Sequence, residues 1–325
     1  MMRRQMTCPC AWIGETNGMN FWQPPRITRR DFISRTTLAV AASASTLAAE
    51  DAKGFRFIAA NDLHYDTGPC REWFTSMIEQ MKASAPDASF CLLCGDLANT
   101  GKKDSLAAVK EIFGGLGVPL HMVPGNHDFT DGDESLANYN EIFPEKLNYR
   151  FEHGGWQFVA LDTTMGTKYD KTTISETTLA WLDAEIPKLD AAKPTICFTH
   201  FPLGEKVTHT PLNASAVVER LIKVNLCGVL SGHWHGASET AAGHGIMTTN
   251  RCCARVRGNH DKSPLKGWFV CEAKADGTLE RKFVEFKAPA GIPQGDAAAS
   301  KKPSSKPKAP PAPAPEPTTE PPVKG

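Results

Sequence analysis

Short apolar runs alternate with helical patterns along residues 54–287. The runs are bounded by polar and turn-forming residues, and runs of this kind predict strands. We expect strands near 55–61, 89–95, 118–123, 156–162, 194–199 and 225–231, and closing strands near 245–249, 268–273 and 279–286. Because helical patterns separate the earlier runs, the alternation predicts a layered α/β domain. No linker or internal repeat divides the region, which indicates one domain.

Apolar residues spaced three or four apart predict four helices that pack against the sheet. The fourth opens at Thr210-Pro211, a capping residue followed by a first-turn proline. The inward-facing residues are Trp73, Phe74, Met77, Ile78 and Met81 in the first helix, Leu106, Val109, Ile112 and Phe113 in the second, Leu179, Leu182 and Ile186 in the third, and Val217, Val218, Leu221 and Ile222 in the fourth. We interpret these stripes as core rather than as a cofactor site.

Five of the predicted strands end in side chains that bind metal ions. In chain order these ends read Asp62-Leu-His64, Gly95-Asp96, Gly125-Asn126-His127-Asp128, His200, and Gly232-His233-Trp-His235. Residues two apart in a strand share a face, and ligands gather at the carboxyl ends of strands in open α/β sheets. Imidazoles and carboxylates are usual ligands of Zn, Mn and Fe. One such pair alone is more often a polar edge, so the ordered series carries the prediction of a metal site.

This series resembles the calcineurin-like metallophosphoesterase family, over essentially the whole of residues 54–287. The sequences Leu161-Asp162-Thr163, Ala180-Trp181-Leu182 and His200-Phe201-Pro202 also resemble the branch that includes bacterial class III cyclic-nucleotide phosphodiesterases. The resemblance implies a β-sandwich core flanked by helices and the hydrolysis of phosphoester bonds. Purple acid phosphatases carry a tyrosine shortly after the Gly-Asp and lack the histidine at position 64, so their tyrosinate-iron chemistry is not implied.

The resemblance also implies a role for each matching residue. Two divalent ions, Mn, Fe, Zn or Co, would activate a bound hydroxide as the nucleophile. His127 would serve the leaving-group oxygen, and Asp128 would orient His127. The first ion would be held by Asp62, His64, Asp96 and His235, and the second by Asp96, Asn126, His200 and His233.

A second Gly-Asn-His-Asp stands at residues 258–261, after the Gly-His-x-His and without a clear strand before it. We therefore assign metal binding to the first copy only. The second copy is expected to form a substrate-facing loop in which Arg251 contacts a phosphate, and a solvated loop is the alternative. His209 is a further candidate for the pocket wall, although a structural or surface role is the usual one for a histidine outside the series.

Three functions are compatible with this pattern. The first is a phosphodiesterase acting on a small organic substrate such as a cyclic nucleotide or a glycerophosphodiester. A phosphomonoesterase would use the same ligand set. A catalytically silent protein that keeps metals for structure is the third, but degenerate members of the family usually lose a ligand, and none is missing here.

Composition and charge restrict the partners of this chain. Its 325 residues are 41% hydrophobic and 22% charged, with no net charge, as in an ordinary soluble protein. Residues 1–49 carry a net charge of +4 and the remainder −4, which leaves no basic footprint for a nucleic-acid polymer. From residue 288 to 325 the chain is rich in Pro, Ala and Lys and is expected to be a solvated tail.

Residues 1–49 resemble an export signal. Arg29-Arg30 precedes a small-residue apolar run over residues 37–49, as in a twin-arginine signal, so we expect the twin-arginine machinery as a partner and a periplasmic or extracellular destination. The run is too short and too weakly apolar to span a membrane, so no transmembrane segment is expected in the mature chain. The arginine pair lies unusually far from residue 1, which suggests a start at Met6 or Met19.

The cysteines do not predict a zinc ribbon. Cys91 and Cys94 form a CxxC, but they lie inside a predicted strand and no second CxxC follows. We interpret them as small buried apolar residues. A disulfide that involves Cys252 or Cys253 is left open by the sequence.

Overall fold

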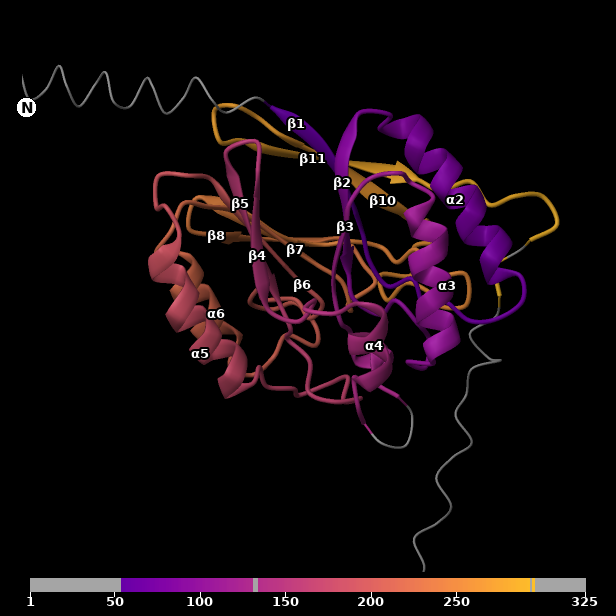
Figure 1. The fold of residues 1–325 in the computed structure, drawn as a ribbon, viewed down its shortest axis with the longest axis horizontal. Helices are drawn as coiled ribbons and strands as arrows, with labels where there is room; N and C mark the ends of the chain where they lie inside the picture. Colours follow the sequence, from indigo (N-terminus) through magenta and orange to yellow (C-terminus); the bar gives the residue numbers. More distant parts are fainter. Residues whose placement is uncertain (1–53, 131–133, 293, 296–325) are drawn as a thin grey trace, which may run out of the picture. The chain divides into compact units, whose positions relative to one another are not determined.

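The computed structural model describes residues 54–130, 134–292 and 294–295, so the predicted export signal and most of the predicted tail lie outside the described residues. Two sheets form the centre of this part (Figure 1). The first has the order β11-β10-β1-β2-β3, with bounds Leu279–Glu285, Gly267–Ala273, Phe55–Ala60, Ala88–Cys94 and Leu120–Val123. The second has the order β4-β5-β6-β7-β9-β8, with bounds Tyr149–His153, Trp156–Leu161, Thr195–Thr199, Leu226–Ser231, Gly245–Thr249 and Ser238–Ala242.

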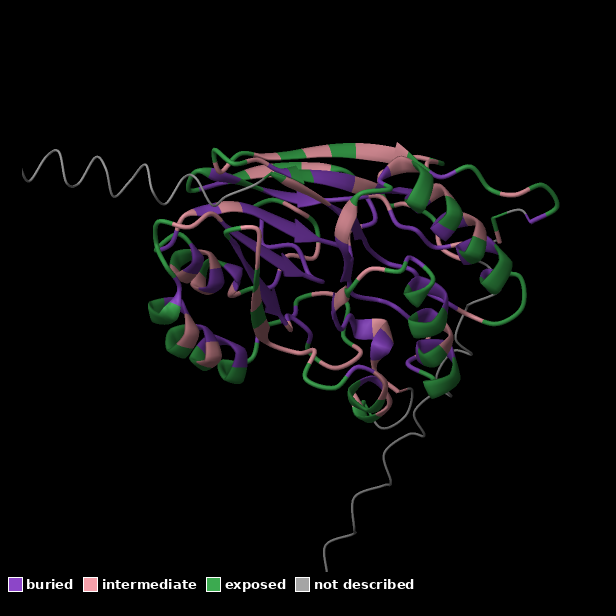
Figure 2. Cartoon of the chain, turned by 45° about the horizontal axis from the view of Figure 1, so that its top comes forward, coloured by how far each residue is buried: buried purple, intermediate pink, exposed green. Residues whose placement is uncertain are grey.

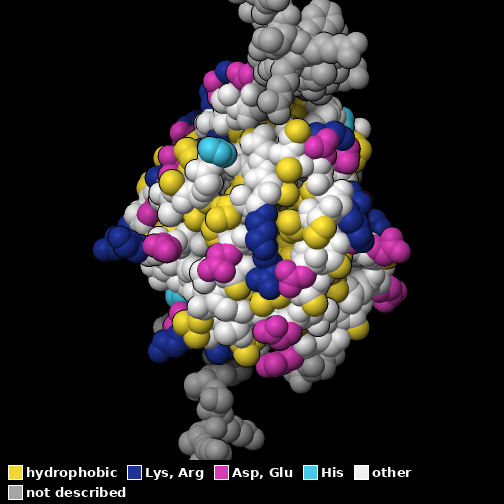
Figure 3. All heavy atoms as spheres, turned by 90° about the vertical axis from the view of Figure 1, so that its left-hand side faces the viewer, with side chains coloured by type: hydrophobic (Ala, Val, Ile, Leu, Met, Phe, Trp, Pro, Cys, Tyr) yellow, Lys and Arg dark blue, Asp and Glu magenta, His cyan; other side chains and the backbone are white. Residues whose placement is uncertain are grey.

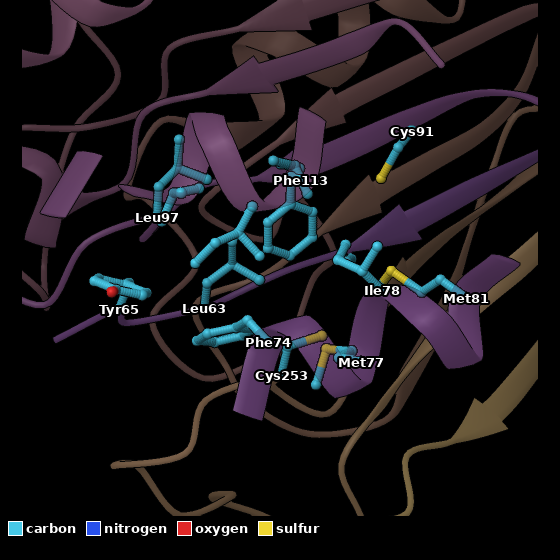
Figure 4. Close-up of a cluster of buried hydrophobic side chains, with 14 of the residues drawn as sticks. Leu63, Tyr65, Phe74, Met77, Ile78, Met81, Cys91, Leu97, Phe113 and Cys253 are labelled. Atoms are coloured by element: carbon cyan, nitrogen blue, oxygen red, sulfur yellow. The ribbon is translucent and has the colours of Figure 1, made fainter. Parts of the chain in front are cut away.

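Helices cover the outer face of the first sheet. The α2 helix (Cys70–Ser84) and the α3 helix (Lys103–Gly114) connect β1 to β2 and β2 to β3, and both connections join parallel strands. In Figure 4 the side chains of Phe74, Met77 and Ile78 from α2 cluster with Phe113 of α3. The predicted stripes of these two helices are therefore core, as expected.

The second sheet is covered in the same way by α5 (Glu176–Glu185) and α6 (Ala214–Leu221). Between the two sheets lies an aromatic core in which Phe57, Phe90, Phe158 and Phe198 are buried. Figure 2 shows the central strands buried and the outward surfaces of the helices exposed. Because β5 and β6 are buried on both faces, their sequences are mostly apolar and do not alternate between apolar and polar residues. The predicted sandwich flanked by helices is confirmed.

Two strands and one α-helix were not predicted, namely β4, β8 and α4 (Ala137–Ile142). The fourth predicted helix also begins later than expected, at Ala214. Thr210 does not cap it, because its Oγ1 donates instead to the carbonyl oxygens of Gly204 and Val207 in the preceding turn. Ile222 was expected inside and is 49% exposed, because the helix ends at Leu221 and the chain turns there.

The surface charges and the state of the cysteines can be compared with the predictions from composition. On the face in Figure 3, basic side chains lie among acidic ones without a continuous basic patch. All eight cysteines of the described part are free thiols, including Cys252 and Cys253, and burial raises the pKa of Cys253 to about 12. None of the helices in residues 54–295 that the structure describes combines the length and the apolar character needed to cross a bilayer.

Candidate metal centre

The ends of five strands bring seven potential ligands to one place. The first sheet supplies the residues after β1, β2 and β3, and the second sheet supplies those after β6 and β7. All seven side chains are buried: Asp62, His64, Asp96, Asn126, His200, His233 and His235. Carboxylates and imidazoles are rarely buried without a partner, so their convergence indicates a charged ligand between them.

The ligand atoms form two groups that share one residue. Asp62, His64, Asp96 and His235 make the first group, and Asp96, His200 and His233 make the second, with the atoms of each within 4.8 Å of one another. Asn126 belongs with the second group, because its Oδ1 lies 3.3 Å from Nε2 of His200. The structure thus brings together the two ligand sets that the resemblance implies, with Asp96 common to both.

The hydrogen bonds of the imidazoles test whether cations fit. Nδ1 of His200 lies 3.0 Å from the carbonyl oxygen of Cys94, and Nε2 of His233 lies 2.8 Å from that of Tyr169. A carbonyl only accepts, so these nitrogens carry the hydrogens and the opposite nitrogens present lone pairs. Those two lone-pair nitrogens are 3.2 Å apart and would repel each other without a cation between them. The donor set therefore suits divalent metal ions.

Burial sets the charge states of the cluster. It lowers the pKa of His64 and of His233 well below the usual value, which favours the neutral form that binds metal. Burial alone would raise the pKa of Asp62, but the nearby His235 and His200 hold it below its usual value. Asp62 is therefore an anionic ligand. Burial lowers the pKa of His235, but the neighbouring Asp62 and Cys252 outweigh burial and raise that pKa well above its usual value.

The local backbone is unusual at the ligands. Five of them have positive φ, with values of 52° at Asp62, 45° at His64, 50° at Asp96, 63° at His233 and 44° at His235. Non-glycine residues adopt this conformation rarely, and such strain concentrates at functional sites. Here it turns each side chain out of the strand direction and into the cluster.

Three glycines that precede the motifs make room for ligands from other strands. A Cβ at Gly95 would overlap the His200 ring, and one at Gly125 would overlap the Asp96 carboxylate. At Gly232 it would lie 2.6 Å from Oδ2 of Asp62. Each of these glycines therefore leaves space for a ligand that another motif provides, which explains why glycine precedes three of the ligand motifs.

The expected partnership of His127 and Asp128 is wrong. Nδ1 of His127 lies 2.8 Å from the backbone oxygen of Asn99, so Asn99 orients the ring. The Asp128 carboxylate instead accepts hydrogen bonds from the backbone N–H groups of Leu97, Ala98 and Gly125, at 3.1, 2.8 and 2.8 Å. Burial and the negative charge of Asp96 raise the pKa of Asp128 to about 7. Through these hydrogen bonds Asp128 connects the loop after β2 to the loop after β3.

A cavity of about 550 Å³ opens beside the two ligand groups. His127 and the predicted pocket residue His209 line it. Arg251 does not, because its Nε lies 3.0 Å from Oδ2 of Asp261 and its guanidinium covers the ring of Phe283. The structure therefore lends no support to a phosphate contact by Arg251.

The second Gly-Asn-His-Asp forms a loop that lines the cavity through Gly258 and His260, as expected of a substrate-facing loop, and that also supports a metal ligand. The Gly258 carbonyl oxygen lies 3.1 Å from Nδ1 of His235, and the His260 N–H donates to the backbone oxygen of His235 at 3.0 Å. A backbone partner of this kind fixes the tautomer and the orientation of a ligating imidazole. The loop thus supports His235 and binds no metal through its own Asn259, whose side chain bonds backbone groups instead.

Several residues of the site were missed by sequence reasoning. Asn99 and Arg257 line the cavity, and Asn61 donates to Oδ2 of Asp62 at 2.6 Å. Asn61 and Asn99 each lie within three residues of a ligand, and Arg257 directly precedes the second Gly-Asn-His-Asp. That proximity is the signal that could have identified them.

Comparison with known proteins decides the family. The model of the calcineurin-like phosphoesterase family matches residues 55–237, a segment that contains all seven ligands. The chain belongs to this family.

Curated relatives of this calcineurin-like phosphoesterase are phosphodiesterases at low identity. A 3',5'-cyclic-nucleotide phosphodiesterase of Nostoc sp. is 28% identical over 171 residues, or 50% of this chain and 62% of that protein. The glycerophosphodiester phosphodiesterase GpdQ of Enterobacter lignolyticus is 29% identical over 169 residues, or 48% and 58%. The chain thus spans about three fifths of the length of both. The cyclic AMP phosphodiesterase CpdA of Escherichia coli is 24% identical over 219 residues, or 64% and 78%.

A solved structure shows the same fold. The purple acid phosphatase PPD1 of yellow lupin superposes with a TM-score of 0.53 at 14% identity, covering 71% of this chain and 52% of that one. At this identity the likeness concerns the fold alone, namely the two sheets and their flanking helices.

Proposed function

We propose that this chain is a phosphoric ester hydrolase that uses two divalent metal ions to cleave a small organic phosphodiester. The observation that carries the proposal is the pair of ligand groups that share Asp96 on the wall of a cavity. A carboxylate has two oxygens for two ions, which suits an in-line displacement at phosphorus. The activities named for the Nostoc, Enterobacter and Escherichia relatives favour a diester over a monoester.

The residues of the chain place and protonate the reacting groups. Ions bound by the two groups would supply Lewis-acid activation of a water and of the phosphoryl oxygens. His127 lines the cavity beside them, and its Nδ1 is held by Asn99. Because Nδ1 keeps its hydrogen for the Asn99 oxygen, the imidazolium form of the ring would give the proton on Nε2 to the leaving-group oxygen and become the neutral Nδ1–H tautomer.

Metal removal tests the proposed function. Protein stripped by a chelator is expected to lose hydrolysis of bis-p-nitrophenyl phosphate and to regain it with Mn, Fe, Zn or Co, with two ions bound per chain by elemental analysis. Faster hydrolysis of p-nitrophenyl phosphate by the same preparation would favour a phosphomonoesterase. Metal uptake without hydrolysis of either ester would instead indicate a silent binding protein.

Replacement of His127 by Ala tests its role as proton donor. We expect kcat to fall about 100-fold for a glycerophosphodiester, whose alkoxide leaving group needs a proton, and far less for bis-p-nitrophenyl phosphate, whose leaving group does not. His244→Ala, at an exposed histidine, is the matched control. Equal losses for the two leaving groups would show that His127 does not donate a proton.

A further inference from the structure

Arg257 lies on the cavity wall without a carboxylate partner. Six other arginines of the described residues pair with a carboxylate, namely Arg56, Arg71, Arg150, Arg220, Arg251 and Arg281. Arg257 is held by a neutral group instead, the side-chain oxygen of Asn99, at 3.2 Å from Nε and 2.7 Å from Nη2. Its positive charge is therefore oriented but not neutralised by a direct partner.

One edge of this guanidinium remains available. Asn99 occupies the edge formed by Nε and Nη2, and none of the described groups accepts a hydrogen bond from Nη1 of Arg257. The edge formed by Nη1 and Nη2 carries two N–H groups in parallel. Such a fork matches two oxygens of one carboxylate or phosphate.

Asn99 also places the Arg257 guanidinium close to His127, the proposed proton donor. Its backbone oxygen holds His127 while its side chain holds Arg257, so the two cavity residues share one anchor. If His127 protonates the leaving-group oxygen, Arg257 lies on the side of the cavity where the leaving group would bind. Among the described residues that line the cavity Asp96 is the one carboxylate, and it belongs to the ligand groups, so no other described carboxylate of the wall opposes an anion at Arg257.

The metal centre and Arg257 would engage different groups of the substrate. A phosphodiester has two non-bridging oxygens, and the metal-ligand groups are where these would bind. A bidentate guanidinium needs two further oxygens, which the reacting phosphorus of a diester does not offer.

We propose that Arg257 binds a second oxyanion, a carboxylate or a further phosphate, carried on the leaving-group side of the substrate. The inference rests on the proposed function, because the role of His127 defines which side of the cavity holds the leaving group. It restricts the substrates to diesters that bear an additional anionic group. Arg257 is in this account a specificity-determining residue.

Calorimetry on the metal-loaded protein tests the proposal without turnover. Glycerol 3-phosphate is the reference, 3-phosphoglycerate adds a carboxylate, and glycerol 1,3-bisphosphate adds a phosphate. We expect at least one of the two ligands with a second anionic group to bind about 10- to 100-fold more tightly than the reference, as for a charge-assisted bidentate contact. The tighter of the two identifies the kind of oxyanion.

Substitutions test whether Arg257 causes this gain in affinity. Arg257→Gln is expected to abolish it, and Arg257→Lys, which keeps the charge but not the fork, to retain only part. Asn99→Ala keeps the backbone oxygen that holds His127 and is expected to reduce the gain by freeing the guanidinium. Arg251→Gln, at an arginine paired with Asp261 outside the cavity, is expected to leave it intact. Equal affinities of the wild type for all three ligands, or a gain unchanged in Arg257→Gln, would overturn the proposal.

A matched pair of diesters connects the binding to catalysis. Glycerophosphoserine differs from glycerophosphoethanolamine by one carboxylate, and the ratio of their kcat/KM values is expected to fall about tenfold or more in Arg257→Gln. An unchanged ratio would contradict the role on the leaving-group side. Failure of the proposed function would appear differently, as an absence of hydrolysis of every diester by the wild type, while the calorimetry still reports on Arg257.

Discussion

Asp96→Asn is expected to lower kcat/KM for bis-p-nitrophenyl phosphate by about 1000-fold or more, because the carboxylate is the one group common to both ligand sets. Its side chain lies 3.4 Å from Nε2 of His64 through Oδ2 and 3.3 Å from Nε2 of His200 through Oδ1. Asparagine has the same shape but no charge, and one of its two positions is an N–H donor that cannot bind a cation.

The metal content separates this effect from misfolding. Asp96 is 1% exposed, and its Oδ1 accepts the N–H of His127 at 2.8 Å, a bond that the asparagine oxygen can keep. We therefore expect a folded protein by circular dichroism that binds fewer than two ions by elemental analysis. Asp183→Asn, at an exposed carboxylate paired with Arg220, is the control. Full activity with two ions bound in Asp96→Asn would show that the two ligand sets do not share this residue.

The sequence predicted the strands best where burial is complete. Runs such as Thr195–Thr199 are buried on both faces, and the polar residue after each run marks the strand end to within a residue or two. Because parallel strands bring their carboxyl ends to one edge, the ligand positions followed from the strand ends alone. The β4 strand was missed because it lies at a sheet edge and is only partly buried. The β8 strand, Ser238–Ala242, is short and polar for the same reason.

Contacts between distant loops could not be predicted in this way. Asp128 follows His127 in the sequence, yet its carboxylate accepts hydrogen bonds from the N–H groups of Leu97 and Ala98, in the loop that follows the Gly95-Asp96 motif. Arg257 and Asn99 are 158 residues apart and meet only because both sheets contribute loops to one cavity. Sequence spacing gives the direction of a side chain along its own strand but not which neighbouring loop it meets.

Gly125→Ala is expected to lower kcat/KM more than about 100-fold, because a displacement of the order of 1 Å at a catalytic centre has an effect of that size. The backbone of Gly125 has φ −113° and ψ 176°, which alanine adopts without strain, so the consequence is steric. A Cβ there would overlap the carboxylate and backbone nitrogen of Asp96 and force the shared ligand away from both groups.

Metal affinity provides the second readout of Gly125→Ala. The variant is expected to bind its ions more weakly in a titration with chelator, since Asp96 serves both ligand sets. Gly114→Ala is the matched control, because it lies in α3 with nothing within 4 Å of its added Cβ. Alanine is favoured over glycine in a helix by about 0.5–1 kcal/mol, so this variant is expected to be at least as stable as the wild type and fully active. Full metal binding and activity in Gly125→Ala would contradict this prediction. They would show that the close approach of the β2 and β3 loops does not position Asp96.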